Sequence, residues 1–188
     1  MDREKLRILI FSLLMVLFIG VPVYMIHTYT TVLNKGKLYR FKCERVDPSD
    51  AFRGKYVQLN FNQGNIDNAY ADSNLKSGQN VYAYLKVDSA GFAYVSKVSV
   101  NKGELNDNFA TTLDYVSSYS GARINFPFER YYMNENLAPL ASDMYRVEAK
   151  VDSVYLDVRV YNGKVVPEEL YLGGMPVREF LKKYAHNK

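Results

Sequence analysis

The chain contains 188 residues, with 24 basic and 20 acidic side chains and one cysteine. This length suits one domain with a hydrophobic core. The near balance of charge, without any run of five like charges, argues against a protein that binds nucleic acid. A single cysteine permits no internal disulfide, so cysteine usage leaves the cellular compartment open.

The first predicted element is a membrane-spanning helix at residues 8–26. This stretch contains no charged side chain, and about 20 apolar residues are enough to cross a bilayer as a helix. A cleaved signal peptide is one alternative, but the apolar run exceeds the usual core of about 7–15 residues and no A-x-A-like cleavage site follows it. A buried core helix is another, although such helices seldom run this long without a strongly polar residue. We predict an uncleaved signal-anchor.

The charges that flank this helix bear on its orientation. Arg3, Lys5 and Arg7 favour a cytoplasmic N-terminus, although four basic residues beyond the other end nearly balance them. A short basic tail before an apolar run is typical of a signal-anchor, so we expect the protein in the inner membrane with its domain outside the cytoplasm. The predicted cytoplasmic tail, spanning helix, threonine-rich juxtamembrane connector and extracytoplasmic domain cover residues 1–7, 8–26, 27–37 and 38–188.

Alternating apolar and polar residues predict the first strands of the domain. Tyr39, Phe41 and Cys43 alternate with charged residues, a pattern typical of a half-buried strand. A turn signal that ends at Gly54 then leads into a predicted strand at residues 56–61, whose apolar positions face one way.

Further strands and hairpins follow along the chain. Asn162 and Gly163 give the best hairpin signal, because Asn-Gly readily takes the two positive φ values of a type I′ turn. Pro127 cannot donate to a β ladder and indicates a strand end. Residues 62–80 are predicted as a loop with room for one helical turn. The other predicted strands lie at residues 81–87, 92–100, 109–119, 123–128, 145–152, 154–160 and 164–172, and short helices at 136–144 and 177–185.

About eight short strands with hairpin turns and little helix predict a mainly β fold. The pattern fits either an antiparallel β-sandwich or a partly open barrel, closed by a short C-terminal helix. Alternating βα units are absent, so a parallel sheet is not expected.

The sequence offers few groups for catalysis. Its two histidines, His27 and His186, lie outside the predicted strands, no pair of side chains has metal-ligand spacing, and no glycine-rich phosphate loop occurs. We therefore predict neither a metal nor another cofactor. Asp47 or Asp50 with Glu129 could serve as a carboxylate pair in an envelope hydrolase, but turn capping and salt bridges explain these residues more simply.

Aromatic side chains are the other unusual feature. The chain has 17 tyrosines and 10 phenylalanines but no tryptophan. Strand propensity and core filling account for most of them, while tyrosines on exposed sheet faces suit recognition of a peptide, glycan or protein.

Residues 54–61, with the sequence GKYVQLNF, resemble the octapeptide of the GDYXXLXY family of bacterial membrane-anchored proteins. Gly54, Tyr56 and Leu59 match that octapeptide, whereas Lys55 replaces its aspartate and Phe61 its second tyrosine. Residues 47–53 are similar to the family's lead-in, D-P-x-D-x-x-R, and residues 124–135 and 158–173 to its second and third blocks.

This resemblance implies an N-terminal anchor and an extracytoplasmic β-rich domain, often encoded beside multi-span membrane proteins, which are candidate partners. It implies no particular activity, and Lys55 favours binding or structure over catalysis. The hypothesis is an accessory module that binds an envelope protein or polymer, with a hydrolase or a purely structural protein as alternatives. The candidate binding and motif residues are Arg53, Gly54, Tyr56, Leu59, Phe61, Tyr131 and Tyr132.

Overall fold

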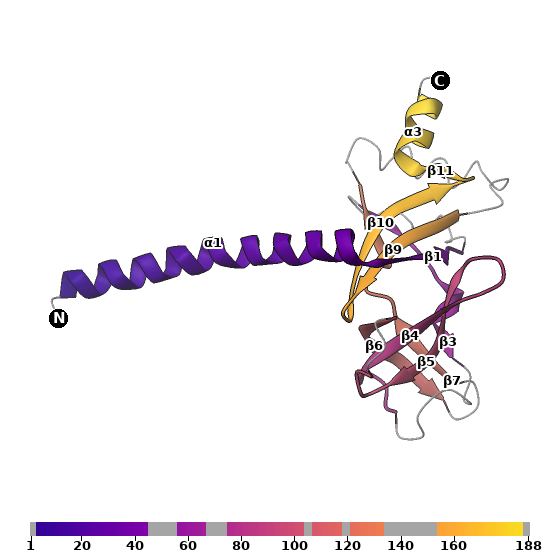
Figure 1. The fold of residues 1–188 in the computed structure, drawn as a ribbon, viewed down its shortest axis with the longest axis horizontal. Coiled ribbons are helices and arrows are strands. Elements are labelled where there is room, and N and C mark those ends of the chain that lie inside the picture. The colour runs from indigo at the N-terminus through magenta and orange to yellow at the C-terminus, as the bar shows by residue number, and fades with distance from the viewer. Residues whose placement is uncertain are drawn as a thin grey trace.

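A computed structural model describes residues 3–44, 56–66, 75–103, 107–117, 121–133 and 154–185. One long helix precedes a mainly β domain, and a short helix follows it (Figure 1). Within the described ranges, the helices are α1 (Arg3–Lys35) and α3 (Val177–Ala185), and a 3-10 turn, η1, covers Asn62–Gly64. The strands are β1 (Lys37–Lys42), β2 (Tyr56–Gln58), β3 (Asn65–Ile66), β4 (Asn80–Val87), β5 (Ala93–Ser99), β6 (Asn108–Ser117), β7 (Gly121–Asn125), β8 (Arg130–Tyr132), β9 (Val154–Tyr161), β10 (Lys164–Leu172) and β11 (Met175–Pro176).

Helix α1 extends away from the domain for most of its length (Figure 1). It has 33 residues, or roughly 50 Å at 1.5 Å per residue, and is long and apolar enough to cross a membrane. None of its most apolar part is buried inside the domain, so a buried core helix is excluded. The helix also runs through most of the segment predicted as a connector and ends at Lys35, which leaves only Gly36 before β1.

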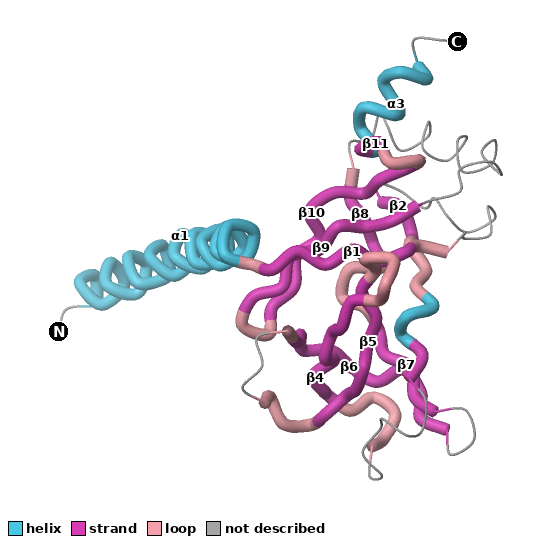
Figure 2. Tube along the Cα trace, turned by 45° about the vertical axis from the view of Figure 1, so that its right-hand side comes forward, coloured by secondary structure: helices cyan, strands magenta, loops and turns pink. Residues whose placement is uncertain are grey.

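The described strands form three sheets that wrap into a nearly closed, barrel-like domain (Figure 2). Their orders are β1-β9-β10-β11, β2-β8 and β3-β7-β6-β4-β5, and every pair of neighbours is antiparallel. Contacts from β1 to β5 and from β6 to β9 and β10 join the larger sheets. The predicted mainly β, antiparallel class with a short C-terminal helix is therefore confirmed.

Five phenylalanines meet where these sheets converge. Phe41 lies on β1, Phe61 precedes η1, Phe109 lies on β6, and Phe126 and Phe128 follow β7. Eight pairs among these rings have centroids 5.0–6.2 Å apart, the range of favourable aromatic contacts. All five side chains are buried. This phenylalanine cluster ties segments from most of the chain into one core.

Several local predictions are confirmed. Tyr39, Phe41 and Cys43 are buried along and just after β1. Asn162 and Gly163 have φ values of 48° and 77°, as a type I′ turn between β9 and β10 requires. Strands β4, β5 and β6 lie within the ranges expected for them or one residue beyond, and α3 matches its predicted helix.

The predicted strand at residues 56–61 is wrong in its second half, because β2 ends at Gln58. The next backbone group, Leu59 N–H, still donates to Glu129 O at 2.7 Å, but Asn60 O accepts from Glu44 N–H at 2.8 Å. The chain thus exchanges one pairing partner for another before η1. Strand β3 was not predicted, whereas the predicted helix at 136–144 and strand at 145–152 lie outside the described residues.

Candidate functional site

Strands β2 and β8 form a two-stranded ribbon that carries three predicted site residues, Tyr56, Tyr131 and Tyr132. Tyr56 pairs directly with Tyr132 across the antiparallel ladder, and their ring centroids lie 5.6 Å apart. The guanidinium carbon of Arg130, a diagonal neighbour, lies 5.2 Å from the centre of the Tyr56 ring, which suits a cation–π contact. Tyr132 is 64% exposed. Tyr56, Arg130 and Tyr132 thus lie together on these two strands. We call these three residues the tyrosine ribbon.

Tyr131 points the other way, as the alternation of a strand requires. Its side chain is buried, and its hydroxyl donates to Glu169 Oε1 on β10 at 3.0 Å. Burial raises the pKa of Tyr131 to about 12, and the negative charge of Glu169 and this hydrogen bond act in the same direction. Tyr131 therefore anchors the ribbon to the β9–β10 sheet instead of offering a surface for binding.

We expect the Tyr131→Phe variant to remove a pH dependence of stability. Below pH 10 the phenol is neutral in both states, so its stabilising effect is complete. Between pH 10 and about 12 the unfolded chain loses the proton while the folded chain keeps it, so wild type loses about 2–3 kcal/mol relative to the variant. Unfolding by denaturant at pH 9 and pH 12 measures this difference, and parallel curves for the two proteins would contradict it.

Three other predicted site residues, Leu59, Phe61 and Glu129, take part in core packing or in a turn. Leu59 and Phe61 are buried in the core, so the second half of the octapeptide contributes packing. Glu129 Oε1 accepts the N–H of Phe126 at 3.3 Å, which places its carboxylate in the turn after β7. Asp47, Asp50, Arg53 and Gly54 lie outside the described residues.

A second aromatic surface, on the β1-β9-β10 sheet, was not predicted. Tyr155 and Tyr171 stack with their centroids 4.8 Å apart and their planes at 13°. The Arg40 guanidinium carbon lies 4.3 Å from the Tyr155 ring centre, and Arg40 Nε donates to Asp157 Oδ1 at 3.0 Å. This hydrogen bond raises the pKa of Arg40. Each charge and ring already has a partner within the sheet, so this surface serves cohesion more than recognition.

The remaining chemistry of the described residues is sparse. They contain no group of three or more His, Cys, Asp or Glu side chains that could hold a metal ion. Cys43 is a free thiol buried in the core, and burial raises its pKa. Because the thiolate is the reactive form, this cysteine is poorly suited to nucleophilic chemistry.

Comparison with protein families gives a match. A sequence model for the family described as GDYXXLXY protein matches residues 18–170. No curated protein and no solved structure matches the chain. The matched range includes the last part of the apolar helix, the tyrosine ribbon and most of the β9–β10 hairpin.

Proposed function

The chain belongs to the GDYXXLXY family, and we propose that it is a single-span membrane protein whose domain binds another envelope protein outside the cytoplasm. The observation that carries the proposal is the tyrosine ribbon, where Tyr56, Arg130 and the exposed Tyr132 lie together. Tyrosine and arginine are, with tryptophan, the residue types enriched among those that dominate the binding energy of protein interfaces. Glu129, engaged in a turn, gives the hydrolase alternative no support.

The apolar helix supports the membrane part of this proposal. Its side chains across residues 8–26 are exposed, and an exposed surface of this size and apolarity needs lipid or a partner to cover it. Arg3, Lys5 and Arg7 at its start favour a cytoplasmic N-terminus. Since only Gly36 separates the helix from β1, the domain is held close to the membrane surface.

One labelling experiment tests orientation and partner binding separately. In intact spheroplasts, we expect the Tyr132→Cys variant to react with a membrane-impermeant, thiol-directed photo-crosslinker and, after illumination, to yield a discrete adduct with another envelope protein. Native Cys43 is buried and should stay unmodified. Tyr94→Cys is the matched control, since Tyr94 is 39% exposed on β5, and it should be labelled without forming that adduct.

Different outcomes would contradict the orientation and the partner binding. Labelling of both variants only after the membrane is broken would reverse the orientation. Labelling of both variants with the same adducts, or with none, would contradict binding at the tyrosine ribbon while leaving the orientation intact.

A further inference from the structure

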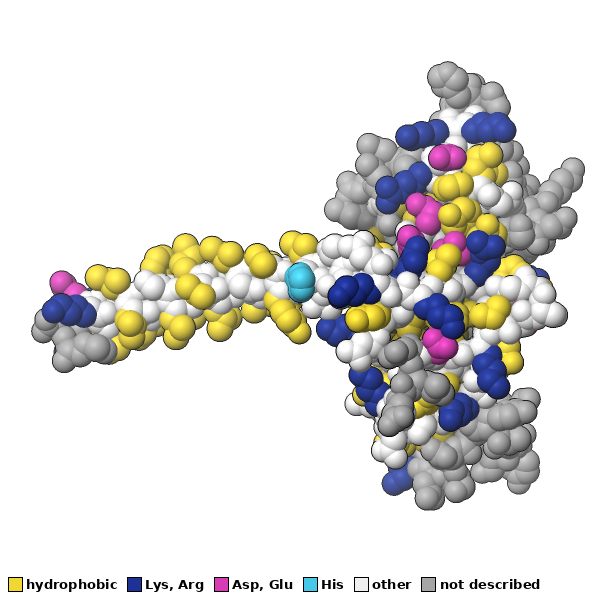
Figure 3. Space-filling view, viewed as in Figure 1, with side chains coloured by type: hydrophobic (Ala, Val, Ile, Leu, Met, Phe, Trp, Pro, Cys, Tyr) yellow, Lys and Arg dark blue, Asp and Glu magenta, His cyan; other side chains and the backbone are white. Residues whose placement is uncertain are grey.

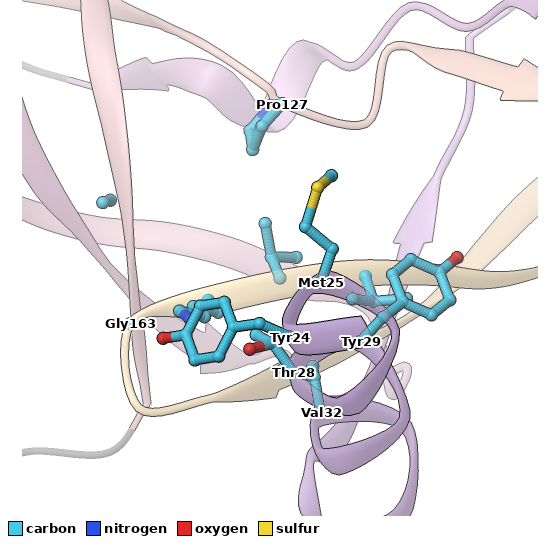
Figure 4. A pocket seen from close by; sticks show the side chains of 11 residues that line it. Tyr24, Met25, Thr28, Tyr29, Val32, Pro127 and Gly163 are labelled. Carbon is cyan, nitrogen blue, oxygen red and sulfur yellow. The ribbon is translucent and has the colours of Figure 1, made fainter. Parts of the chain in front are cut away.

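A groove of about 390 Å³ lies between the end of α1 and the β9–β10 hairpin (Figure 4). The helix contributes Tyr24, Met25 and Tyr29, and β10 contributes Val165 and Val166. Pro127, opposite the helix, is a further wall (Figure 4). This volume falls within the range of about 300–1,000 Å³ typical of small-molecule sites, and the walls are mainly apolar. The groove therefore suits a hydrocarbon chain.

The position of the groove along α1 sets its depth relative to a bilayer. The apolar run ends at Ile26 and is followed by His27 and Thr28, and Tyr24 and Met25 belong to the last turn of this run. Tyrosines prefer the boundary between acyl chains and headgroups. If α1 spans a membrane, the groove opens at this boundary, beside the acyl chains of the lipids that surround the helix.

Positive charge gathers beside the groove. Lys164 lines it, and its ammonium lies 5.9 Å from the Tyr24 ring centre. Lys102 reaches the same hairpin and donates to Asn162 Oδ1 at 2.8 Å. The described residues that line the groove include no acidic side chain, and Figure 3 shows lysine and arginine side chains close to where α1 meets the domain. An anionic headgroup would meet Lys164 at the level where the phosphates of the bilayer lie.

We propose that this groove holds an acyl chain of an anionic phospholipid, whose phosphate pairs with Lys164. The inference rests on the proposed membrane anchoring but not on partner binding at the tyrosine ribbon. Continuity with the spanning helix identifies the occupant, because membrane lipid is the apolar molecule always present at this depth. The lipid would fill the space between helix and hairpin and hold the domain at a fixed angle to the membrane.

Native mass spectrometry of the full chain, released from nanodiscs of phosphatidylcholine and phosphatidylglycerol, tests the proposal. We expect wild type to retain one phosphatidylglycerol, and the Lys164→Glu variant to retain it at least about fivefold less often. Lys86→Glu is the matched control, since Lys86 is exposed on β4 and does not line the groove. Ala110→Phe, which adds a ring to the groove wall, should reduce retention without lowering the melting temperature.

The outcomes separate this inference from the anchoring on which it depends. Failure of the chain to enter nanodiscs would overturn both. Entry with equal retention by wild type, Lys164→Glu and Lys86→Glu, or with no preference for phosphatidylglycerol over phosphatidylcholine, would overturn the lipid site alone. Crosslinking of Met25 to a second copy of the chain or to a partner helix would show that protein fills the groove, and this result would also overturn the lipid site.

Discussion

The Phe41→Ala variant is expected to lose about 3–5 kcal/mol of unfolding free energy. Phe41 is fully buried, and its ring meets Phe61, Phe126 and Phe128 at centroid distances of 6.0, 5.6 and 5.0 Å. Truncation removes these contacts and leaves a cavity between segments that are held in place by different strands, so the site cannot readily collapse. A loss of this size is a large fraction of the stability of a typical domain, about 5–15 kcal/mol.

Denaturant unfolding of the full chain in detergent, followed by near-UV circular dichroism, measures this loss. Tyr132→Ala is the matched control, because Tyr132 is 64% exposed and a surface truncation usually changes stability by no more than about 0.5 kcal/mol. Similar midpoints for Phe41→Ala and Tyr132→Ala would show that the phenylalanine cluster does not organise the core.

The phenylalanine cluster also explains the family octapeptide in physical terms. Its Leu59 and Phe61 are 1% and 2% exposed, so these two positions are constrained by packing. Tyr56 lies on the ribbon with Tyr132 and Arg130. One short motif therefore contributes residues both to the core and to the candidate binding surface.

Several elements of the fold could be predicted from short sequence patterns. Alternation identified the buried face of β1, and the positive φ values favoured by Asn162 and Gly163 identified the β9–β10 turn. These features depend on a few adjacent residues. The antiparallel β class follows from them without knowledge of distant contacts.

Irregular pairing could not be predicted in the same way. Continued from its two-residue turn, the β9–β10 hairpin would place Tyr155 opposite Leu170. Instead, the register shifts between Pro167 and Glu169, so that Tyr155 pairs with Tyr171. This shift creates the stacked tyrosine pair on the β1-β9-β10 sheet. A bulge of one residue changes which side chains meet, and no composition signal marked it.

The groove was missed for a related reason. A threonine-rich segment after the apolar run indicated a connector, whereas α1 continues to Lys35 and packs against β9 and β10. Thr30 and Thr31 keep their hydroxyls bonded to backbone carbonyls four residues earlier, so polar side chains here are compatible with helix. The walls of the groove come from residues 24–32, 110, 127 and 163–166, which lie far apart in the sequence and meet only in the folded structure.

Substitution of Gly36 by alanine is expected to disturb the joint between α1 and the domain. A Cβ atom at this position would lie 2.3 Å from Val32 O, 3.0 Å from Arg159 Cβ and 3.2 Å from Val160 N. Two of these are backbone atoms, one on α1 and one on β9, so the last turn of α1 and the start of β1 must shift relative to β9. The Gly36 carbonyl also accepts a hydrogen bond from Arg159 Nη1 at 3.1 Å, and this contact would weaken with the shift.

We expect Gly36→Ala to cost about 1–3 kcal/mol, the usual effect of forcing extra atoms into a packed site. Hydrogen exchange of the full chain should locate the damage as faster exchange at the end of α1 and along β1, with β4 and β5 unchanged. Gly20→Ala provides the matched control on the same helix, since a Cβ there would meet nothing within 4 Å. Unchanged exchange at the joint in Gly36→Ala would mean that helix and domain are not rigidly coupled, and the fixed groove between them would lose its structural basis.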